Sequence, residues 1–294
     1  MDTASYTLAR GAVAAGRLPE AKTVRVEEFV NYFREEMPAD SNAVFAVRCE
    51  GGPSAFGDGL DLLKITVKAR ELLPGERKDA VLTFAVDTSG SMNLGDRLSL
   101  VKQALETLVG SLKPEDRVGI VAFGATPYLV LPHTPARERE RIAGAVRSLA
   151  PGGGTNVEAG LDLAYRVADE VFEKKAVNRV LLCSDGVANV GARGPGEILR
   201  KAEVFAKRGI YLSCAGFGMG KYSDVMLETL ANKGNGNYAY VDSPAAAVEV
   251  FQKNLPSTLQ VLALDAKIQV DFNPDVVSHY RLLGYENRDI ADKD

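Results

Sequence analysis

The sequence predicts an α/β fold: a doubly wound, mostly parallel β-sheet with one antiparallel edge strand and helices on both faces. Three observations predict it. Residues 80–86 form a near-continuous apolar run, the pattern of a strand buried on both faces of a sheet. Such runs alternate along the chain with segments whose apolar residues recur at three- and four-residue steps, as in amphipathic helices. The short link at 124–127 suits a hairpin, which makes one edge strand antiparallel.

The elements follow one another in a regular order. The strand at 80–86 leads into a helix whose apolar stripe consists of Leu98, Val101, Leu105, Leu108 and Leu112. Further strands are expected at 118–123, 128–131, 179–183, 210–215 and 238–241. Further helices are expected at 136–149, 157–171, 197–207, 224–231 and 244–255. Because strands joined by helical crossovers lie parallel to one another, these elements build a Rossmann-like sheet.

The two flanks of this region have a different pattern. Residues 26–33 place an apolar stripe on a short helix, and 44–48 and 62–67 are typical of strands. Residues 262–272 largely alternate between apolar and polar side chains, as a half-buried strand does. We expect the flanks to form one small β-rich domain into which the α/β domain is inserted. Separate docking of each flank on the central sheet is the alternative.

The expected domain organisation therefore has three segments. Residues 1–77 are a helical and β-rich N-terminal flank, and 78–256 are the α/β domain. Residues 257–294 are a C-terminal β flank that we expect to pair with the first flank and to be incomplete. Pairing is expected because neither flank alone can cover the apolar faces of its strands.

Composition excludes several classes of protein. The 294 residues are 46% hydrophobic and 25% charged, which is ordinary for a globular chain. With 35 Lys and Arg against 39 Asp and Glu, no basic surplus favours a nucleic-acid partner. No apolar run approaches the ~18 residues of a membrane span. Three cysteines without a CxxC motif, and only two histidines, argue against a disulfide scaffold or a zinc site.

Polar residues at the ends of the predicted strands indicate where a ligand binds. In a doubly wound sheet, ligands lie outside the carboxyl ends of the strands. Asp87, Ser89 and Ser91 follow the first strand in a D-x-S-x-S motif, and Asp185 follows a later strand within Ser-Asp-Gly. Thr155 lies in the sequence Gly-Gly-Gly-Thr-Asn before a helix. We expect these three oxygen-rich loops to converge.

The chemistry of these side chains favours a hard divalent cation. Hydroxyl and carboxylate oxygens are the donors that Mg²⁺, Mn²⁺ or Ca²⁺ prefer. Five side chains with two carboxylates would roughly neutralise the ion without filling six octahedral positions. An open or water-filled position therefore remains for an outside ligand.

Together these motifs resemble the metal-ion-dependent adhesion site of von Willebrand factor type A domains, over roughly residues 78–256. The flanking stretches 2–6, 26–33 and 285–288 resemble the bacterial YfbK-like subgroup, in which further modules precede and follow the type A domain. The subgroup resemblance implies an extracytoplasmic or lipid-anchored protein. The chain itself shows no signal segment, so the compartment stays unknown.

The resemblance also implies a role for each site residue. Ser89, Ser91 and Thr155 would contact the cation directly when a ligand is bound. Asp87 and Asp185 would act through water, and Asp185 could bind directly in a ligand-free state. An Asp or Glu side chain of a protein partner would complete the shell. All five positions match the family motif.

Simpler interpretations compete with this one. Asp87, Ser89 and Ser91 alone could cap a helix, and glycines 152–154 could cradle a phosphate, although no lysine follows them. The glycine-rich stretch 216–221 lacks the spacing of a P-loop. We expect the histidines, His133 and His279, to be structural or on the surface. We expect Cys183 and Cys214 to be small core residues without a disulfide.

Three functions remain, and the first is the prediction. It is a protein-binding module, for adhesion or scaffolding, that depends on a divalent cation and is not an enzyme. The second is a metal-dependent phosphoryl hydrolase, which is disfavoured because Ser89 stands where an acid–base aspartate is expected if Asp87 is a nucleophile. The third is a structural module whose site is vestigial.

Overall fold

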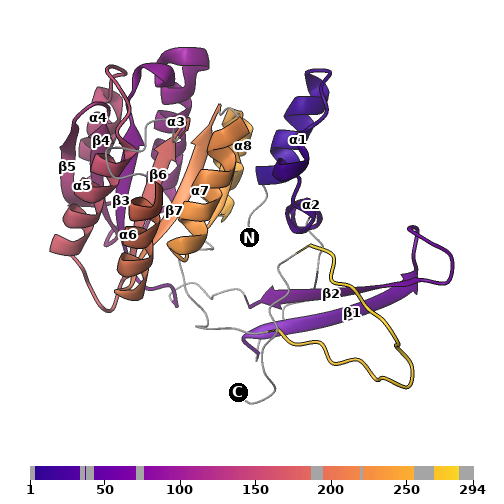
Figure 1. The fold of residues 1–294 in the computed structure, drawn as a ribbon. Coiled ribbons are helices and arrows are strands. Elements are labelled where there is room, and N and C mark those ends of the chain that lie inside the picture. Colours follow the sequence, from indigo (N-terminus) through magenta and orange to yellow (C-terminus); the bar gives the residue numbers. More distant parts are fainter. Residues whose placement is uncertain are drawn as a thin grey trace. The chain divides into compact units, whose positions relative to one another are not determined.

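The computed structural model describes residues 4–33, 37, 43–70, 76–186, 195–218, 221–254 and 268–284 (Figure 1). The chain divides into two compact units. The larger unit is made of Met1–Phe33, Lys78–Leu259 and Tyr280–Asp294, and the smaller of Arg34–Arg77 and Gln260–His279. Each unit is described by itself.

A six-stranded sheet forms the centre of the larger unit. Its spatial order is β5-β4-β3-β6-β7-β8. The strands are β3 (Ala80–Asp87), β4 (Arg117–Phe123), β5 (Pro127–Pro135), β6 (Val177–Ser184), β7 (Ile210–Phe217) and β8 (Tyr238–Val241). Every neighbouring pair is parallel except β4 and β5, which are antiparallel. This confirms the predicted fold class, with its antiparallel strand at the edge.

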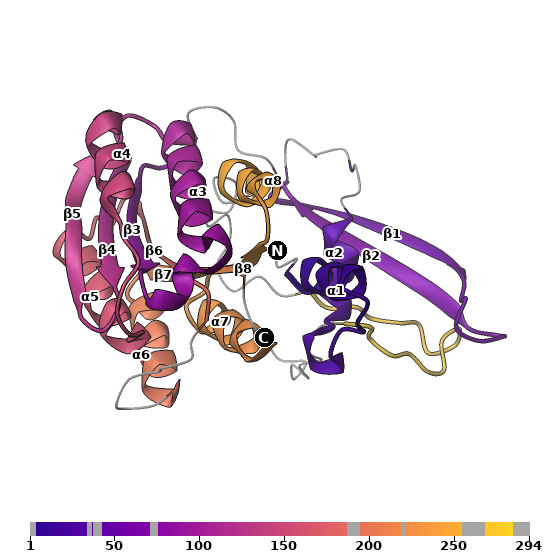
Figure 2. The ribbon, with the colours of Figure 1, turned by 90° about the horizontal axis from the view of Figure 1, so that it is seen from above.

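Helices cover both faces of the sheet, as Figure 2 shows. One face is covered by α3 (Arg97–Ser111), α4 (Arg139–Ser148) and α8 (Pro244–Val248), which continues as the π-helix Glu249–Asn254. The other face is covered by α5 (Val157–Glu170), α6 (Pro195–Lys207) and α7 (Lys221–Lys233). Within the described residues, no helix combines the length and the apolar composition that a membrane span requires.

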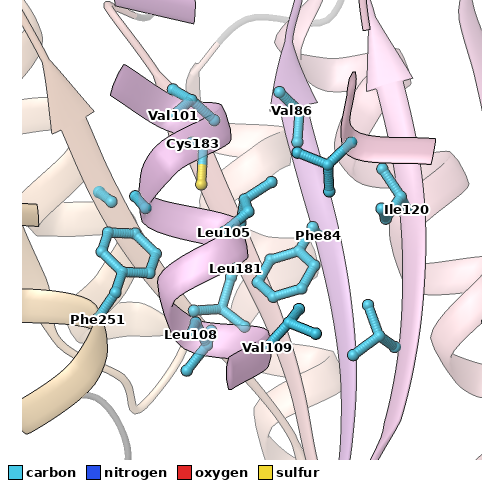
Figure 3. Packing of buried hydrophobic residues seen from close by; sticks show 14 of the residues in the cluster. Phe84, Val86, Val101, Leu105, Leu108, Val109, Ile120, Leu181, Cys183 and Phe251 are labelled. Atoms are coloured by element: carbon cyan, nitrogen blue, oxygen red, sulfur yellow. The ribbon is translucent and has the colours of Figure 1, made fainter. Parts of the chain in front are cut away.

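The core explains why these segments fold as they do. All eight residues of β3 are buried, because helices lie on both of its faces. The predicted apolar stripe of α3 packs against Phe84 and Ile120 in one core cluster (Figure 3). On the opposite face, α5 approaches β4 closely, since a Cβ atom at Gly160 would lie 2.5 Å from the ring of Phe123.

The cysteines of the sheet are core residues, as predicted. Cys183 and Cys214 are buried thiols that form no disulfide, and they belong to the core clusters on opposite faces of the sheet. Neighbouring strands thus place the two thiols where they cannot form a disulfide. Burial raises the pKa of the Cys183 thiol to about 12.

The N-terminal helices belong to the larger unit. They are α1 (Ala4–Ala14), the 3-10 turn Ala21–Thr23 and α2 (Val26–Tyr32). Arg10 pairs with Asp242 at 3.0 Å after β8, and Arg25 pairs with Glu228 of α7 at 3.2 Å. Two ion pairs therefore tie this module to the sheet domain.

The predicted apolar stripe of α2 is not a buried face. Val26, Val30 and Phe33 are exposed, and Phe29 is partly buried. The buried residue of this helix is Glu28, whose carboxylate accepts from the Ser5 backbone N–H at 2.7 Å and pairs with Arg25. Polar contacts of Glu28 and ring contacts of Phe29 and Phe33 with Tyr6 thus together hold α2 against α1.

The smaller unit contains the hairpin of β1 (Phe45–Pro53) and β2 (Asp61–Ala69), which pair antiparallel. The strands expected at 44–48 and 62–67 are therefore present. The prediction of a strand at 262–272 is wrong for 268–272, because these residues form neither helix nor strand. Residues 262–267 lie outside the described residues. Ile268 and Val270 are exposed. A segment with alternating apolar and polar residues forms a stable strand only where it pairs with a neighbouring strand. Joining of the two flanks stays a prediction.

Candidate functional site

The site begins with Asp87, the last residue of β3. Its side chain is fully buried and accepts hydrogen bonds from the Ser89 backbone N–H at 2.8 Å and the Ser184 hydroxyl at 2.7 Å. Burial raises the pKa of Asp87, an effect that the bonds from Ser184 and Ser89 oppose. Within the part of the chain that the structure describes, no basic side chain pairs with this carboxylate. Because a buried charge is costly without a compensating charge, a carboxylate with only neutral hydrogen-bond donors favours the binding of a cation.

Ser89, Ser91 and Asp185 form a connected group beside it. The two serine hydroxyls are 3.0 Å apart, and the Ser91 hydroxyl donates to Asp185 Oδ1 at 3.0 Å. Ser89 is the N-cap of the 3-10 turn Gly90–Asp96, which turns both serines toward the same point. The structure therefore brings together the predicted residues of the first and third loops.

The second loop is fastened to the first by its backbone. Gly152 N–H donates to the Thr88 carbonyl at 2.7 Å, and Gly90 N–H donates to the Gly153 carbonyl at 3.0 Å. Gly153 has φ 79°, a conformation that favours glycine. Thr155 follows on this loop and is half-buried, immediately before Asn156, which caps α5. The backbone of the loop thus sets the position of Thr155. In the part of the chain that the structure describes, its side chain makes no hydrogen bond to the other four predicted site residues.

Two residues of the site escaped sequence reasoning. The first is Ser184, whose hydroxyl donates a hydrogen bond to Asp87. Its position directly before the predicted Asp185, in the Ser-Asp-Gly motif, could have indicated this role. Arg97, the first residue of α3, approaches Asp185 Oδ2 to 2.5 Å and the Ser91 carbonyl to 3.4 Å. Its signal was weak, because a basic residue at a helix start is normally solvated.

The other singled-out residues lie elsewhere. His133 is on β5, where its Nε2 atom is 3.0 Å from the Thr83 hydroxyl, and His279 is exposed in the smaller unit. Burial and the nearby charge of Arg117 lower the pKa of His133 to about 4. Of the glycine-rich stretch 216–221, residues 219 and 220 lie outside the described residues.

The donor set fits a hard cation rather than a soft one. Only two carboxylates are present, and no group of three or more His, Cys, Asp or Glu side chains is placed to hold a metal within the described residues. A cation here would depend on serine and threonine hydroxyls, which suit Mg²⁺, Mn²⁺ or Ca²⁺. The Asp87 carboxylate, which has no basic partner among the described residues, would supply charge for such an ion.

Comparisons with known proteins place the chain in a family. The family model described as "von Willebrand factor type A domain" matches residues 82–187, which contain the whole oxygen cluster. A model described as "von Willebrand factor" matches 1–64, and one described as "Uncharacterized protein YfbK, C-terminal" matches 257–294. The protein described as "Uncharacterized protein YfbK" from Escherichia coli K12 is 36% identical over 298 residues, covering 99% of this chain and 52% of that protein.

The chain belongs to the YfbK-like branch of von Willebrand factor type A domain proteins. A second relative of this type A domain protein is "Uncharacterized protein sll0103" of Synechocystis. It is 28% identical over 212 residues, which cover 72% of this chain and 49% of that protein. The chain thus spans about half the length of both relatives.

A solved structure agrees with the type A fold. The "von Willebrand factor type A" protein from Catenulispora acidiphila superposes with a TM-score of 0.55 at 19% identity. The match covers 75% of this chain and 51% of that one. At this identity the likeness supports the fold of the type A domain and no more.

Proposed function

We propose that this type A domain is a protein-binding module that uses a divalent cation to recruit an acidic side chain of a partner. The match to the von Willebrand factor type A domain family supports the broader role, an interaction or scaffold module. The observation that carries the finer proposal is the oxygen cluster around Asp87, a buried carboxylate without a basic partner among the described residues. Mg²⁺, Mn²⁺ or Ca²⁺ would bind there.

Each residue would contribute a separate part of the binding. Ser89, Ser91 and Thr155 would offer hydroxyl oxygens to the ion, while Asp87 and Asp185 would hold it through water. The bound ion would supply the positive charge that an Asp or Glu side chain of a partner recognises. The protein's own contribution is to hold these oxygens in place through Ser184 and the backbone bonds between the first two loops.

The buried environment makes the charge of the ion effective. Asp87 is fully buried, and the neighbouring glycine loops bring their backbones within hydrogen-bond distance of each other. Low solvent exposure strengthens electrostatic attraction between an ion and a carboxylate compared with open water. A partner carboxylate is therefore favoured over a neutral amide of the same shape.

The first experiment measures the metal alone. Mg²⁺ and Mn²⁺ are titrated calorimetrically into the chain and into Asp87→Asn. Asp162→Asn is the matched control, because Asp162 lies on α5 and pairs with Lys201 of α6. The proposal expects binding to the native chain and to the control, and loss of binding in Asp87→Asn. Failure of the native chain to bind either ion would support a structural module with a vestigial site.

The second experiment measures the partner chemistry. A library of peptides that each carry one Asp or Glu is compared with the same peptides carrying Asn or Gln. We expect binding that needs Mg²⁺, favours the acidic peptides and is abolished by a chelator. Equal binding of acidic and amide peptides would contradict recruitment through the cation.

A hydrolase is the competing function and has its own test. Within the described residues, Asp87 accepts hydrogen bonds from the Ser89 backbone N–H and the Ser184 hydroxyl, and the neighbouring Asp185 carboxylate is already engaged by Ser91 and Arg97, so no free base stands ready to accept a proton. We expect no turnover of p-nitrophenyl phosphate with Mg²⁺ or Mn²⁺. Turnover that Asp87→Asn removes would instead favour the enzyme.

A further inference from the structure

Arg97 lies at the edge of the oxygen cluster, and the proposed function gives it no role. Its guanidinium donates to Asp185 Oδ2 at 2.5 Å, while Asp185 Oδ1 accepts from the Ser91 hydroxyl at 3.0 Å. Arg97 also reaches the Ser91 carbonyl at 3.4 Å. Both oxygens of the Asp185 carboxylate are therefore engaged within the site.

The surrounding backbone holds this arginine in place. Gly95 and Asp96 have φ of 57° and 58°, and this turn starts α3 at Arg97, so that its side chain returns to the cluster. Gly218, at the end of β7, has φ 59°. A Cβ atom there would stand 2.4 Å from Arg97 Nε, so glycine leaves the space in which the side chain lies. Residues from two distant parts of the chain thus build one position for the guanidinium.

The charges show what the contact does. The side chain of Asp185 is 8% exposed and that of Arg97 is 25% exposed, so the ion pair is shielded from most of the solvent. A charged hydrogen bond of this kind is stronger than an exposed surface pair. Arg97 therefore neutralises one of the two carboxylates of the site, whereas Asp87 is left to neutral donors.

We propose that Arg97 competes with the divalent cation for Asp185 and thereby sets the metal affinity of the site. This inference rests on the proposed function. A guanidinium and a divalent cation both use the Asp185 carboxylate as a counter-charge, and two positive charges at the same cluster repel each other. Metal binding then requires the Arg97–Asp185 ion pair to break, and the free energy of breaking it lowers the metal affinity. In the metal-free protein, Arg97 balances the charge of Asp185.

Calorimetric titration of Mn²⁺ into the full chain tests the competition. Arg97→Gln removes the charge and keeps a polar side chain, Arg97→Lys keeps the charge, and Arg141→Gln is a control that removes a surface arginine paired with Glu138. We expect Arg97→Gln to bind Mn²⁺ at least about tenfold more tightly, which equals about 1.4 kcal/mol. Arg97→Lys and the control should stay close to the native affinity.

Thermal unfolding, measured with and without the metal, gives a second readout. In a chelator, Arg97→Gln should unfold at a lower temperature than the native chain, because Asp185 has lost its charged partner. At saturating Mn²⁺ the difference should shrink, since the metal then supplies the counter-charge. If Arg97→Gln does not fold, Arg97→Met replaces it in both measurements.

The outcomes separate this inference from the proposed function. Equal or weaker Mn²⁺ binding by Arg97→Gln overturns the competition and leaves the metal site standing. Binding to the variant but not to the native chain supports the competition and refutes the proposed function of the native protein. Absence of binding in both refutes both.

Discussion

His133 should make the stability of this protein depend on pH below neutrality. Its ring lies on β5 over Gly119, where a Cβ atom would stand 2.8 Å from the imidazole, and its Nε2 atom is 3.0 Å from the Thr83 hydroxyl. Burial and the charge of Arg117 lower the pKa of His133 from 6.5 to about 4. The folded protein therefore keeps this ring neutral at pH values where the unfolded chain protonates it.

The size and sign of the effect follow from that shift. Between pH 6.5 and about 4 the unfolded chain binds a proton at this position that the folded protein does not. The free energy of unfolding therefore falls as the pH falls through this window. At pH 4, the difference between the folded and unfolded pKa values of His133 lowers the free energy of unfolding by about 3 kcal/mol. This is an upper value, because part of the ring contacts solvent.

Urea unfolding between pH 7.5 and pH 4.5 measures this prediction. The native chain is compared with His133→Gln, which cannot gain a proton, and with His279→Gln, which removes the exposed histidine of the smaller unit. We expect the native chain and the His279 variant to lose stability together on acidification, and His133→Gln to lose less. Parallel pH profiles for all three proteins would refute the reasoning.

Three further predictions concern packing, anchoring and the site. Gly160→Ala should lower the free energy of unfolding by about 1–3 kcal/mol, because the new methyl group meets the buried ring of Phe123. Gly144→Ala on α4 has open space around the new methyl group and should raise the free energy of unfolding slightly. Chemical denaturation measures both effects. Arg25→Met should reduce hydrogen-exchange protection in α1 and α2, because the buried glutamate of α2 loses a charged partner, and unchanged protection would contradict this. Thr155→Ala should weaken acidic-peptide binding more than Mn²⁺ binding, and equal losses in two titrations would count against its ligand-dependent role.

The sheet was predictable because its signals are local. A strand buried on both faces must be apolar throughout, as 80–86 is, and a helix that covers it must repeat its apolar residues, as Leu98 to Leu112 do. Right-handed crossovers then bring the carboxyl ends of parallel strands to one edge. The meeting of Ser91 with Asp185, 94 residues apart, follows from that topology.

Other features depend on contacts that no local pattern records. The alternation at 268–272 is typical of a strand, yet a strand also needs a partner, and Ile268 is exposed. The apolar stripe of α2 is equally regular, but Glu28 is the buried residue because Ser5 and Arg25 satisfy it. Periodicity describes one segment, while burial depends on what lies opposite.

The sequence by itself determined the α/β class, the edge hairpin and the three loops of the oxygen cluster, since each depends on residue types that are close together in the chain. Only the tertiary structure placed Arg97 against Asp185. That contact needs the positive φ of Gly95 and Asp96 and the missing side chain of Gly218, which lies more than a hundred positions away. Backbone turns and space left by a distant glycine have no periodic signature, so the charge balance of the site becomes visible only when the chain is folded.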